Sequence, residues 1–363
     1  MPAADHEELD AWLRLTLIAG LGNAALRKLL QEFGSPDRVL AARQTELKRS
    51  VAVDIAAQIA AGGNAARAQQ ALAWLADPIN AIVTLGDSNY PQLLLQTADP
   101  PPLLYIKGRR ELLNRPALAV VGSRNATAQG NANAEEFART LSNAGITIVS
   151  GLALGIDAAA HRGGLAGAAS SIAVVGTGLD VVYPARNREL AHELAARGAL
   201  VSEFALGTPA LGANFPRRNR VISGMCRGCV VVEAALQSGS LITARLANEQ
   251  GREVFALPGS IHSPLAKGCH ALIKQGAKLV DSANDILEEL DFAAISPQEP
   301  HASPELDADA AHLLELIGYE PAHLDALCAR AEMGADVISS LLLKLELHGL
   351  IENLPGGQFQ RVR

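Results

Sequence analysis

The sequence has few aromatic residues, few cysteines and no long apolar run. Aromatic residues make up 4% of the 363 residues, and only four residues are cysteine. We find no apolar stretch long enough to span a membrane, and the N-terminus lacks the basic region and apolar core of a signal peptide. We therefore expect a cytoplasmic protein with reduced thiols and no membrane span.

Several motifs that would indicate a cofactor are also missing or incomplete. Gly176 and Gly178 match the first two glycines of a dinucleotide-binding fingerprint, but Val181 stands in the third position. We find no phosphate-binding loop of the G-x-x-x-x-G-K-[ST] type. Cys226 and Cys229 form an isolated CxxC pair beside an apolar run, which favours buried structural cysteines over a zinc site. We expect neither a cofactor nor a bound metal.

The central part of the chain, residues 81–290, predicts an α/β fold. Short apolar runs alternate with helical patterns, which is typical of a mostly parallel sheet covered by helices on both faces. We expect an extended Rossmann-like, doubly wound sheet. Its predicted strands are residues 81–86, 117–124, 146–152, 171–178, 199–204, 228–234, 253–259 and 278–282.

Two smaller parts flank this sheet. Residues 1–80 predict a helical domain resembling a SAM or helix-hairpin-helix unit; its Gly20-Leu21-Gly22 turn could grip a phosphate, but the scarcity of nearby basic residues favours helix packing. Residues 291–306 predict a linker. Residues 307–363 predict three helices and a hairpin, hence a winged helix. Its third helix carries Lys344 as the only cation, which favours protein contact over duplex reading.

Small residues where strands end indicate anion binding. Ser123 and Arg124 are the last residues of one predicted strand, and Ser150 and Gly151 lie near the end of another. The carboxyl ends of parallel strands share one crevice, where exposed backbone N–H groups can hold phosphates.

A cluster of arginines stands out because the whole chain is acidic, with a net charge of −7. Arg217, Arg218 and Arg220 lie close to Phe215 in the stretch NFPRRNRVISG. Guanidinium groups pair with phosphates, and an aromatic ring can stack on any base. The stretch predicts either a groove for single-stranded nucleic acid or a solvated cluster capping a helix, and the residues alone leave both open.

Four carboxylate or imidazole groups could act as acids or bases. Asp157 and His161 are four residues apart on a predicted helix, but helix capping by Asp157 and a structural hydrogen bond from His161 are favoured. Glu203 and Glu233, at strand ends, could be acid–base groups or could order the arginines through ion pairs.

The central part resembles the bacterial DNA-processing protein A family (DprA, also called Smf). The resemblance is colinear and rests on VVGSR, SGLALGIDAAAHRGGL, IAVVGTGLDVVYPARN, SEF, NFPRRNRVISG, VVVEAALQSGSLITARLANEQGREVFALPGS and KGCHALIKQGA. The outer domains match the family with weaker motifs.

The resemblance implies a non-enzymatic recombination mediator that binds single-stranded DNA, protects it, and helps load the RecA recombinase during natural transformation. It implies a dimerising Rossmann-type core. Phosphates would be held by Ser123, Arg124, Ser150, Gly151, Arg217, Arg218 and Arg220, and by Gly239 and Ser240 of the SGS turn, while Phe215 would stack on a base.

Two other functions remain as alternatives. A Rossmann-type nucleoside monophosphate hydrolase would need a PGGxGT-type loop, whereas this chain has LPGS at Leu257–Ser260. A dimeric adaptor without DNA binding would use the sheet only as a scaffold. The apolar residues of Ala271–Ser282, at a predicted sheet edge, indicate a homodimer, although burial under the last helix explains them nearly as well.

Overall fold

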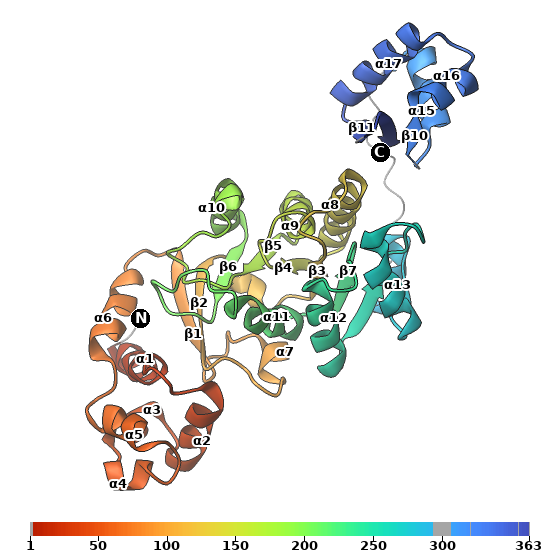
Figure 1. Ribbon diagram of the computed structural model, residues 1–363. Coiled ribbons are helices and arrows are strands. Elements are labelled where there is room, and N and C mark those ends of the chain that lie inside the picture. Colours follow the sequence, from red (N-terminus) through yellow and green to blue (C-terminus); the bar gives the residue numbers. More distant parts are fainter. Residues whose placement is uncertain (1–2, 293–305, 320, 355, 363) are drawn as a thin grey trace.

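The computed structural model describes residues 3–292, 306–319, 321–354 and 356–362. Its centre is a nine-stranded sheet with helices on both faces (Figure 1). The strands are β1 (Asn80–Thr84), β2 (Leu103–Gly108), β3 (Ala117–Val121), β4 (Thr147–Ser150), β5 (Ser171–Val174), β6 (Ala199–Ser202), β7 (Gly228–Val231), β8 (Glu253–Ala256) and β9 (Lys278–Leu279).

The strand order is β1-β2-β6-β5-β4-β3-β7-β8-β9. All pairs from β6 to β9 along this order are parallel, whereas β1 pairs with β2, and β2 with β6, in antiparallel fashion. The doubly wound, mostly parallel fold predicted from the sequence is therefore confirmed. The predicted strands did not include β2, which joins β1 to the parallel part of the sheet.

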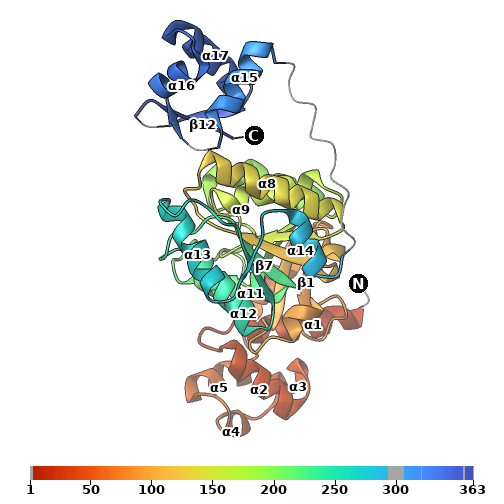
Figure 2. The same cartoon turned by 90° about the vertical axis from the view of Figure 1, so that its right-hand side faces the viewer.

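Each face of the sheet has its own apolar core. Along β3, Ala117, Ala119 and Val121 pack on one face, and Leu118 and Val120 on the other, because successive strand side chains point to opposite sides. The first face is covered by α7 (Gln92–Leu95), α11 (Asn214–Gly224), α12 (Ser240–Glu249) and α13 (Lys267–Lys274). The second is covered by α8 (Ala128–Asn143), α9 (Ile156–Ala166), α10 (Arg188–Arg197) and α14 (Ala283–Glu289) (Figure 1 and Figure 2).

Helices α8 and α9 approach each other very closely. A Cβ atom placed on Gly163 of α9 would lie 2.0 Å from the backbone oxygen of Glu135 in α8. Only glycine fits at this position without moving one of the helices. The two helices therefore form a tight layer against β3 and β4.

Among residues 3–79, six helices precede the sheet: α1 (Ala3–Thr16), α2 (Asn23–Phe33), α3 (Pro36–Ala41), α4 (Gln44–Leu47), α5 (Val53–Ala60) and α6 (Ala65–Trp74). Helices α2 to α5 surround their own small core. Leu9 and Leu13 of α1 and Ala68 of α6 instead share a core with Leu103 and Tyr105 of β2. This core therefore extends across the boundary predicted at residue 80, and it contains residues from both sides of that boundary.

The C-terminal part contains α15 (Ala308–Ile317), α16 (Leu324–Ala331) and α17 (Ala335–Leu347), together with β10 (Ala322–His323), β11 (Ile351–Leu354) and β12 (Gln358–Arg361). The strands form a separate sheet in the order β10-β12-β11, and the helices share a separate core. This is a winged helix, as predicted. Lys344 of α17 pairs with Asp307 at 2.6 Å. Most of the predicted linker lies outside the described residues.

Within the described ranges, no helix is both long and apolar enough to cross a membrane. The same residues contain no cluster of histidine, cysteine and carboxylate groups suited to a metal ion. Cys226 and Cys229 are fully buried, and burial raises the pKa of the Cys229 thiol to about 12.

Candidate nucleic-acid interface

The strand order reverses at β3, which has β4 on one side and β7 on the other. In doubly wound sheets the crevice outside the carboxyl ends of such strands is where ligands bind. Because β3, β4, β5 and β7 run parallel, the loops after them leave the same edge of the sheet, and helices α8, α9 and α12 begin there. We call this edge, made of residues 122–127, 151–155, 175–184, 214–218 and 232–240, the strand-end crevice.

An aromatic cluster, made of Phe215, Tyr183 and Arg124, lies at the strand-end crevice. The ring centroids of Phe215 and Tyr183 are 5.6 Å apart, and the guanidinium carbon of Arg124 lies 5.7 Å from the Phe215 centroid. Tyr183 is 47% exposed, Arg124 is exposed and Phe215 is half-buried. The cluster therefore offers aromatic faces and a cation to solvent at one place.

The backbone around Gly176 sets the position of Phe215. The Asn214 side-chain amide donates to the Gly176 carbonyl at 3.0 Å, and a Cβ on Gly176 would approach the Phe215 ring to 3.1 Å. Tyr183 was not among the residues predicted from the sequence. It lies within the segment that resembles the family, but no spacing pattern links it to Phe215.

Arg217 and Arg220 both reach Glu203, just beyond β6. They are three residues apart and therefore share one side of α11. Arg217 lies 3.2 Å from the Glu203 carboxylate and is half exposed. Arg220 is more buried, pairs with the same carboxylate, and also contacts Asp99 at 3.6 Å. Burial raises the pKa of Glu203, although both arginines oppose that shift.

Arg218 is buried, with 4% of its surface exposed. Its guanidinium donates to the backbone oxygens of Gly151 and Val174, which lie at the ends of β4 and β5. Burial lowers its pKa to about 10, while the nearby Asp157 carboxylate acts in the opposite direction. Arg218 is therefore not exposed to solvent as Arg217 is. Its contacts with two backbone carbonyls indicate that Arg218 positions the loops after β4 and β5.

The loop after β4 is held by buried hydrogen bonds. The Ser150 hydroxyl donates to the Val120 carbonyl at 2.7 Å, and the Gly151 amide donates to the Asp157 carboxylate at 3.1 Å. A Cβ on Gly151 would lie 2.5 Å from the Arg218 guanidinium, so a side chain here would displace that guanidinium. Ser150 thus faces the interior, and Gly151 forms the floor of the strand-end crevice.

His161 makes structural hydrogen bonds, as favoured from the sequence. Its Nε2 atom accepts from the Leu152 amide at 3.3 Å, and its Nδ1 atom lies 2.7 Å from the Ser171 hydroxyl. Burial, with help from Arg218 and Arg162, lowers the pKa of His161 to about 3. Asp157 accepts from the amides of the loop before α9 and is not its N-cap residue.

The loop after β3 is fixed by Glu233 at the end of β7. The Ser123 amide donates to the Glu233 carbonyl at 2.7 Å, and the Glu233 carboxylate accepts from the amide and hydroxyl of Thr127 at 3.0 and 2.6 Å. Glu233 thus orders the start of α8, whereas Glu203 orders arginines. Ser123 is buried in this arrangement, while the neighbouring Arg124 points outward.

The SGS turn begins α12. Gly239 is exposed, and a Cβ at this position would meet no atom within 4 Å. Ser240 is buried, with its hydroxyl 2.6 Å from that of Ser238. The Asn219 amide reaches the Gly239 carbonyl at 3.5 Å, which links this turn to α11.

Comparisons with known proteins identify two family models that match this chain. The family model for DNA recombination-mediator protein A matches residues 81–291, and that for the DprA winged helix domain matches residues 296–357. Protein Smf of Escherichia coli is 45% identical over 297 residues, covering 80% of this chain and 79% of its own length. DNA processing protein DprA of Streptococcus pneumoniae is 48% identical over 206 residues, covering 57% and 73%.

Two solved structures of DNA processing protein A are similar to this chain. The Streptococcus pneumoniae structure has a TM-score of 0.69 and 37% identity, and the match covers 81% of this chain and 99% of that one. The Helicobacter pylori structure, described as showing a single-stranded DNA binding mode, has a TM-score of 0.54 and 28% identity, covering 59% and 97%.

Proposed function

The chain belongs to the DNA recombination-mediator protein A family, and from this we propose that it binds single-stranded DNA and acts as a non-enzymatic recombination mediator. The observation that carries the proposal is the aromatic cluster of Phe215, Tyr183 and Arg124, which lies at the strand-end crevice. Exposed rings stack on bases of any identity, and a guanidinium pairs with phosphate. The single-stranded DNA binding described for the Helicobacter pylori relative supports the same reading.

The strand would follow the strand-end crevice. Arg124 and the half-exposed Arg217 would contact phosphates directly, and the open Gly239 amide at the start of α12 would hold another. Ser123, Ser150, Gly151 and Ser240 would shape the loops. Arg218 would hold the crevice floor from below, and Arg220 would act through Glu203.

A comparison of single-stranded with blunt duplex DNA in a gel-shift assay tests this function. We expect clear preference for the single strand with little sequence selectivity, because phosphate contacts and stacking do not read base edges. Alanine at both Phe215 and Tyr183 should remove most of that preference. Equal affinity for both DNA forms would contradict the proposal, and would favour a scaffold that does not bind DNA through this edge.

The family resemblance further supports a role in loading RecA during natural transformation. The measurement is RecA filament formation on single-stranded DNA already covered by a single-strand-binding protein, with and without this chain. We expect faster filament formation with the wild type than with the Phe215→Ala, Tyr183→Ala double variant. Identical rates in the presence and absence of the wild type would contradict the loading role.

We also propose a homodimer formed through the β9 edge of the sheet. Leu279 is 47% exposed on this edge strand, and a groove of about 820 Å³ lies beside it between α12 and α13. Val280, in contrast, is fully buried, as expected if this residue packs inside the domain and not against a second copy. Sedimentation should give a dimer for the wild type and a monomer for Leu279→Glu. A monomeric wild type at micromolar concentration would contradict it.

A further inference from the structure

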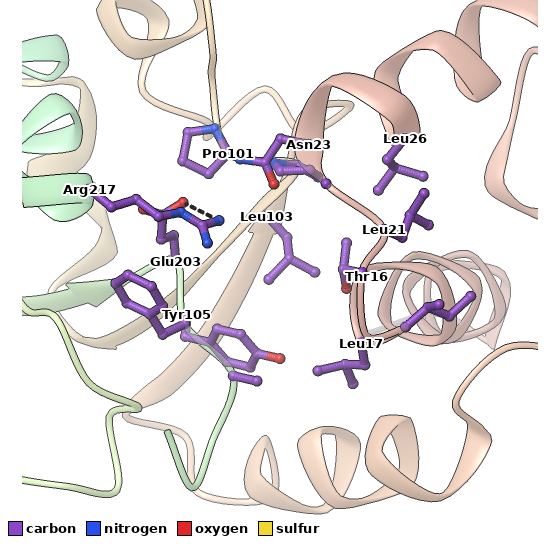
Figure 3. A pocket seen from close by; sticks show the side chains of 16 residues that line it. Thr16, Leu17, Leu21, Asn23, Leu26, Pro101, Leu103, Tyr105, Glu203 and Arg217 are labelled. Atoms are coloured by element: carbon purple, nitrogen blue, oxygen red, sulfur yellow. Dashed lines mark hydrogen bonds and ion pairs between the residues drawn. The ribbon is translucent and has the colours of Figure 1, made fainter. Parts of the chain in front are cut away.

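A second cavity lies between the N-terminal helices and the antiparallel edge of the sheet. It has a volume of about 350 Å³, opens to solvent, and is lined by the turn joining α1 to α2, the start of β2 and the residues after β6. Figure 3 shows Leu17, Leu21 and Leu26 on one side, with Leu103 and Pro101 facing them. We call this cavity the interdomain pocket. Its size suits a small organic ligand.

Two buried polar atoms in this pocket lack a partner among the described residues. They are the Tyr105 hydroxyl, on a side chain that is 1% exposed, and the Oε1 atom of Glu203, whose side chain is 2% exposed. Figure 3 shows the Tyr105 hydroxyl directed into the interdomain pocket. Unpaired buried polar atoms are unfavourable and uncommon in folded proteins, so both are suited to hydrogen-bond a ligand.

Tyr90 differs from Tyr105 in its hydrogen bonding. Tyr90 is equally buried, but its hydroxyl donates to the Pro101 carbonyl at 2.8 Å. The fold therefore gives the Tyr90 hydroxyl a hydrogen bond and leaves the Tyr105 hydroxyl without one at the wall of the interdomain pocket.

Another side of the interdomain pocket carries groups that can bind an anion. Gly22 and Asn23, where α2 begins, line it together with the half-exposed Arg217, which also pairs with Glu203 at 3.2 Å. The first N–H groups of a helix lack partners within the helix, and the N-cap residue Gly22 has no side chain to cap them. The first turn of α2 also contains no acidic residue. A phosphate at this side would meet helix amides and a guanidinium.

We propose that the interdomain pocket binds one mononucleotide unit. The phosphate would lie at the start of α2 and Arg217, and the base would lie among the leucines with its polar edge toward Tyr105 and Glu203. The unit could be a nucleotide of the bound single strand, in which case this inference rests on the proposed function. It could equally be a free nucleotide, and the experiment separates the two sources.

The first measurement is calorimetric titration of the full-length chain with each of the four deoxynucleoside 5′-monophosphates. Gly22→Leu fills the interdomain pocket from a position where a Cβ meets no atom within 4 Å. The matched control is Ala24→Leu, which enlarges an exposed residue of the same helix. If the source is a free nucleotide, we expect the wild type and the control to bind one per chain and Gly22→Leu to lose binding.

Tyr105→Phe tests the hydroxyl itself. It removes one oxygen that has no partner among the described residues, so we expect an unchanged or higher melting temperature. Binding should weaken by about tenfold, the effect of losing one ordinary hydrogen bond. Tyr319→Phe, at an exposed tyrosine of the winged helix, is the control and should leave binding unchanged.

The second measurement uses an oligonucleotide containing 4-thiothymidine, photocrosslinked to the chain and mapped by mass spectrometry. Crosslinks to residues 16–26 or 101–105 that disappear in Gly22→Leu would support a strand nucleotide. Binding of a monophosphate that Gly22→Leu abolishes would support a free nucleotide. If the oligonucleotide binds but neither result appears, this inference is wrong and the proposed function stands. If the oligonucleotide does not bind at all, the proposed function fails, and the calorimetry alone decides whether the pocket takes a nucleotide.

Discussion

Arg217 and Arg218 are neighbours in the sequence, yet their guanidinium groups have different surroundings. Arg217 is half exposed, whereas Arg218 lies on the same buried stripe of α11 as Val221 and Ile222. Residues three and four positions apart share one side of a helix, while adjacent residues do not. The helical spacing from Arg218 to these apolar residues was therefore a signal in the sequence that could have predicted its burial.

We predict that Arg218→Met lowers the free energy of unfolding by about 3–5 kcal/mol, because removing one member of a buried polar network leaves the others unpaired. The groups left behind are the Gly151 and Val174 carbonyls and the Asp157 carboxylate. Urea unfolding measures the change. Arg217→Met is the control and should cost less than Arg218→Met, because Arg217 is half exposed and the buried Glu203 carboxylate keeps its ion pair with Arg220. Equal losses in both variants would contradict the assignment of Arg218 as a positioning residue.

Salt dependence separates phosphate contacts from stacking. Arg124→Ala and Arg217→Ala should each reduce the slope of log affinity against log salt by about 0.7, because one fewer counterion is released from a single strand. Phe215→Ala and Tyr183→Ala should weaken binding by about 1–3 kcal/mol with little change in slope. Fluorescence anisotropy over a range of salt concentrations measures both. A changed slope in the aromatic variants, with none in the arginine variants, would reverse these roles.

His161 should make stability depend on pH. Its pKa in the folded chain is about 3, below the ordinary value of 6.5, so the unfolded chain binds more protons between these values. The stabilisation is complete above about pH 6.5 and is lost as the pH falls, at up to about 1.4 kcal/mol per pH unit.

Unfolding measured from pH 7.5 to pH 5 tests this expectation. His161→Gln should flatten the loss of stability seen in the wild type over this range. His262→Gln, at an exposed loop histidine, is the control and should keep the wild-type profile. Buried Asp157 and Glu203 have raised pKa values and act in the opposite direction, so the informative quantity is the difference between each variant and the wild type.

At the scale of elements, close helix packing depends on single glycines. We predict that Gly163→Ala destabilises the chain by about 1–3 kcal/mol, because its Cβ would lie 2.0 Å from the Glu135 carbonyl oxygen of α8. Gly212→Ala, in open space, is the control and should not be destabilising. Thermal unfolding of both variants measures the difference. An unchanged melting temperature for Gly163→Ala would mean that α8 and α9 can move apart without any loss of stability.

The parallel strands could be predicted because each is a short apolar run between helical patterns. Strand β2 was not predicted, although its residues 103–106 are also a short apolar run, after Pro100-Pro101-Pro102. Its antiparallel place between β1 and β6 could not be predicted, because β6 is almost 100 residues away in the sequence. The site was predicted only in part for the same reason, namely that its residues are distant in the sequence. The sequence indicated Phe215 and the arginines, but only the folded loops bring Tyr183 and Arg124 to Phe215.

At the scale of the whole molecule, the two ends of the chain contribute unequally to the stability of the sheet, because only the N-terminal helices share a core with it. Deleting residues 1–80 would expose Ile82, Leu103 and Tyr105, which now pack against α1 and α6. The winged helix has a separate core, so deleting residues 306–363 should not disturb the sheet. We predict a markedly lower melting temperature for the fragment 81–292, and little change for the fragment 1–305. Calorimetry of both fragments measures the difference, and equal melting temperatures would contradict it.

The buried Arg218 has a consequence for how quickly a strand is captured. Because it ties the ends of β4 and β5 together, the floor of the strand-end crevice is already built before any ligand arrives. A preformed surface needs no slow rearrangement after contact, so the association rate should follow collision frequency and long-range attraction. Stopped-flow traces should then rise in a single phase, with rate constants proportional to DNA concentration and decreasing as salt is added.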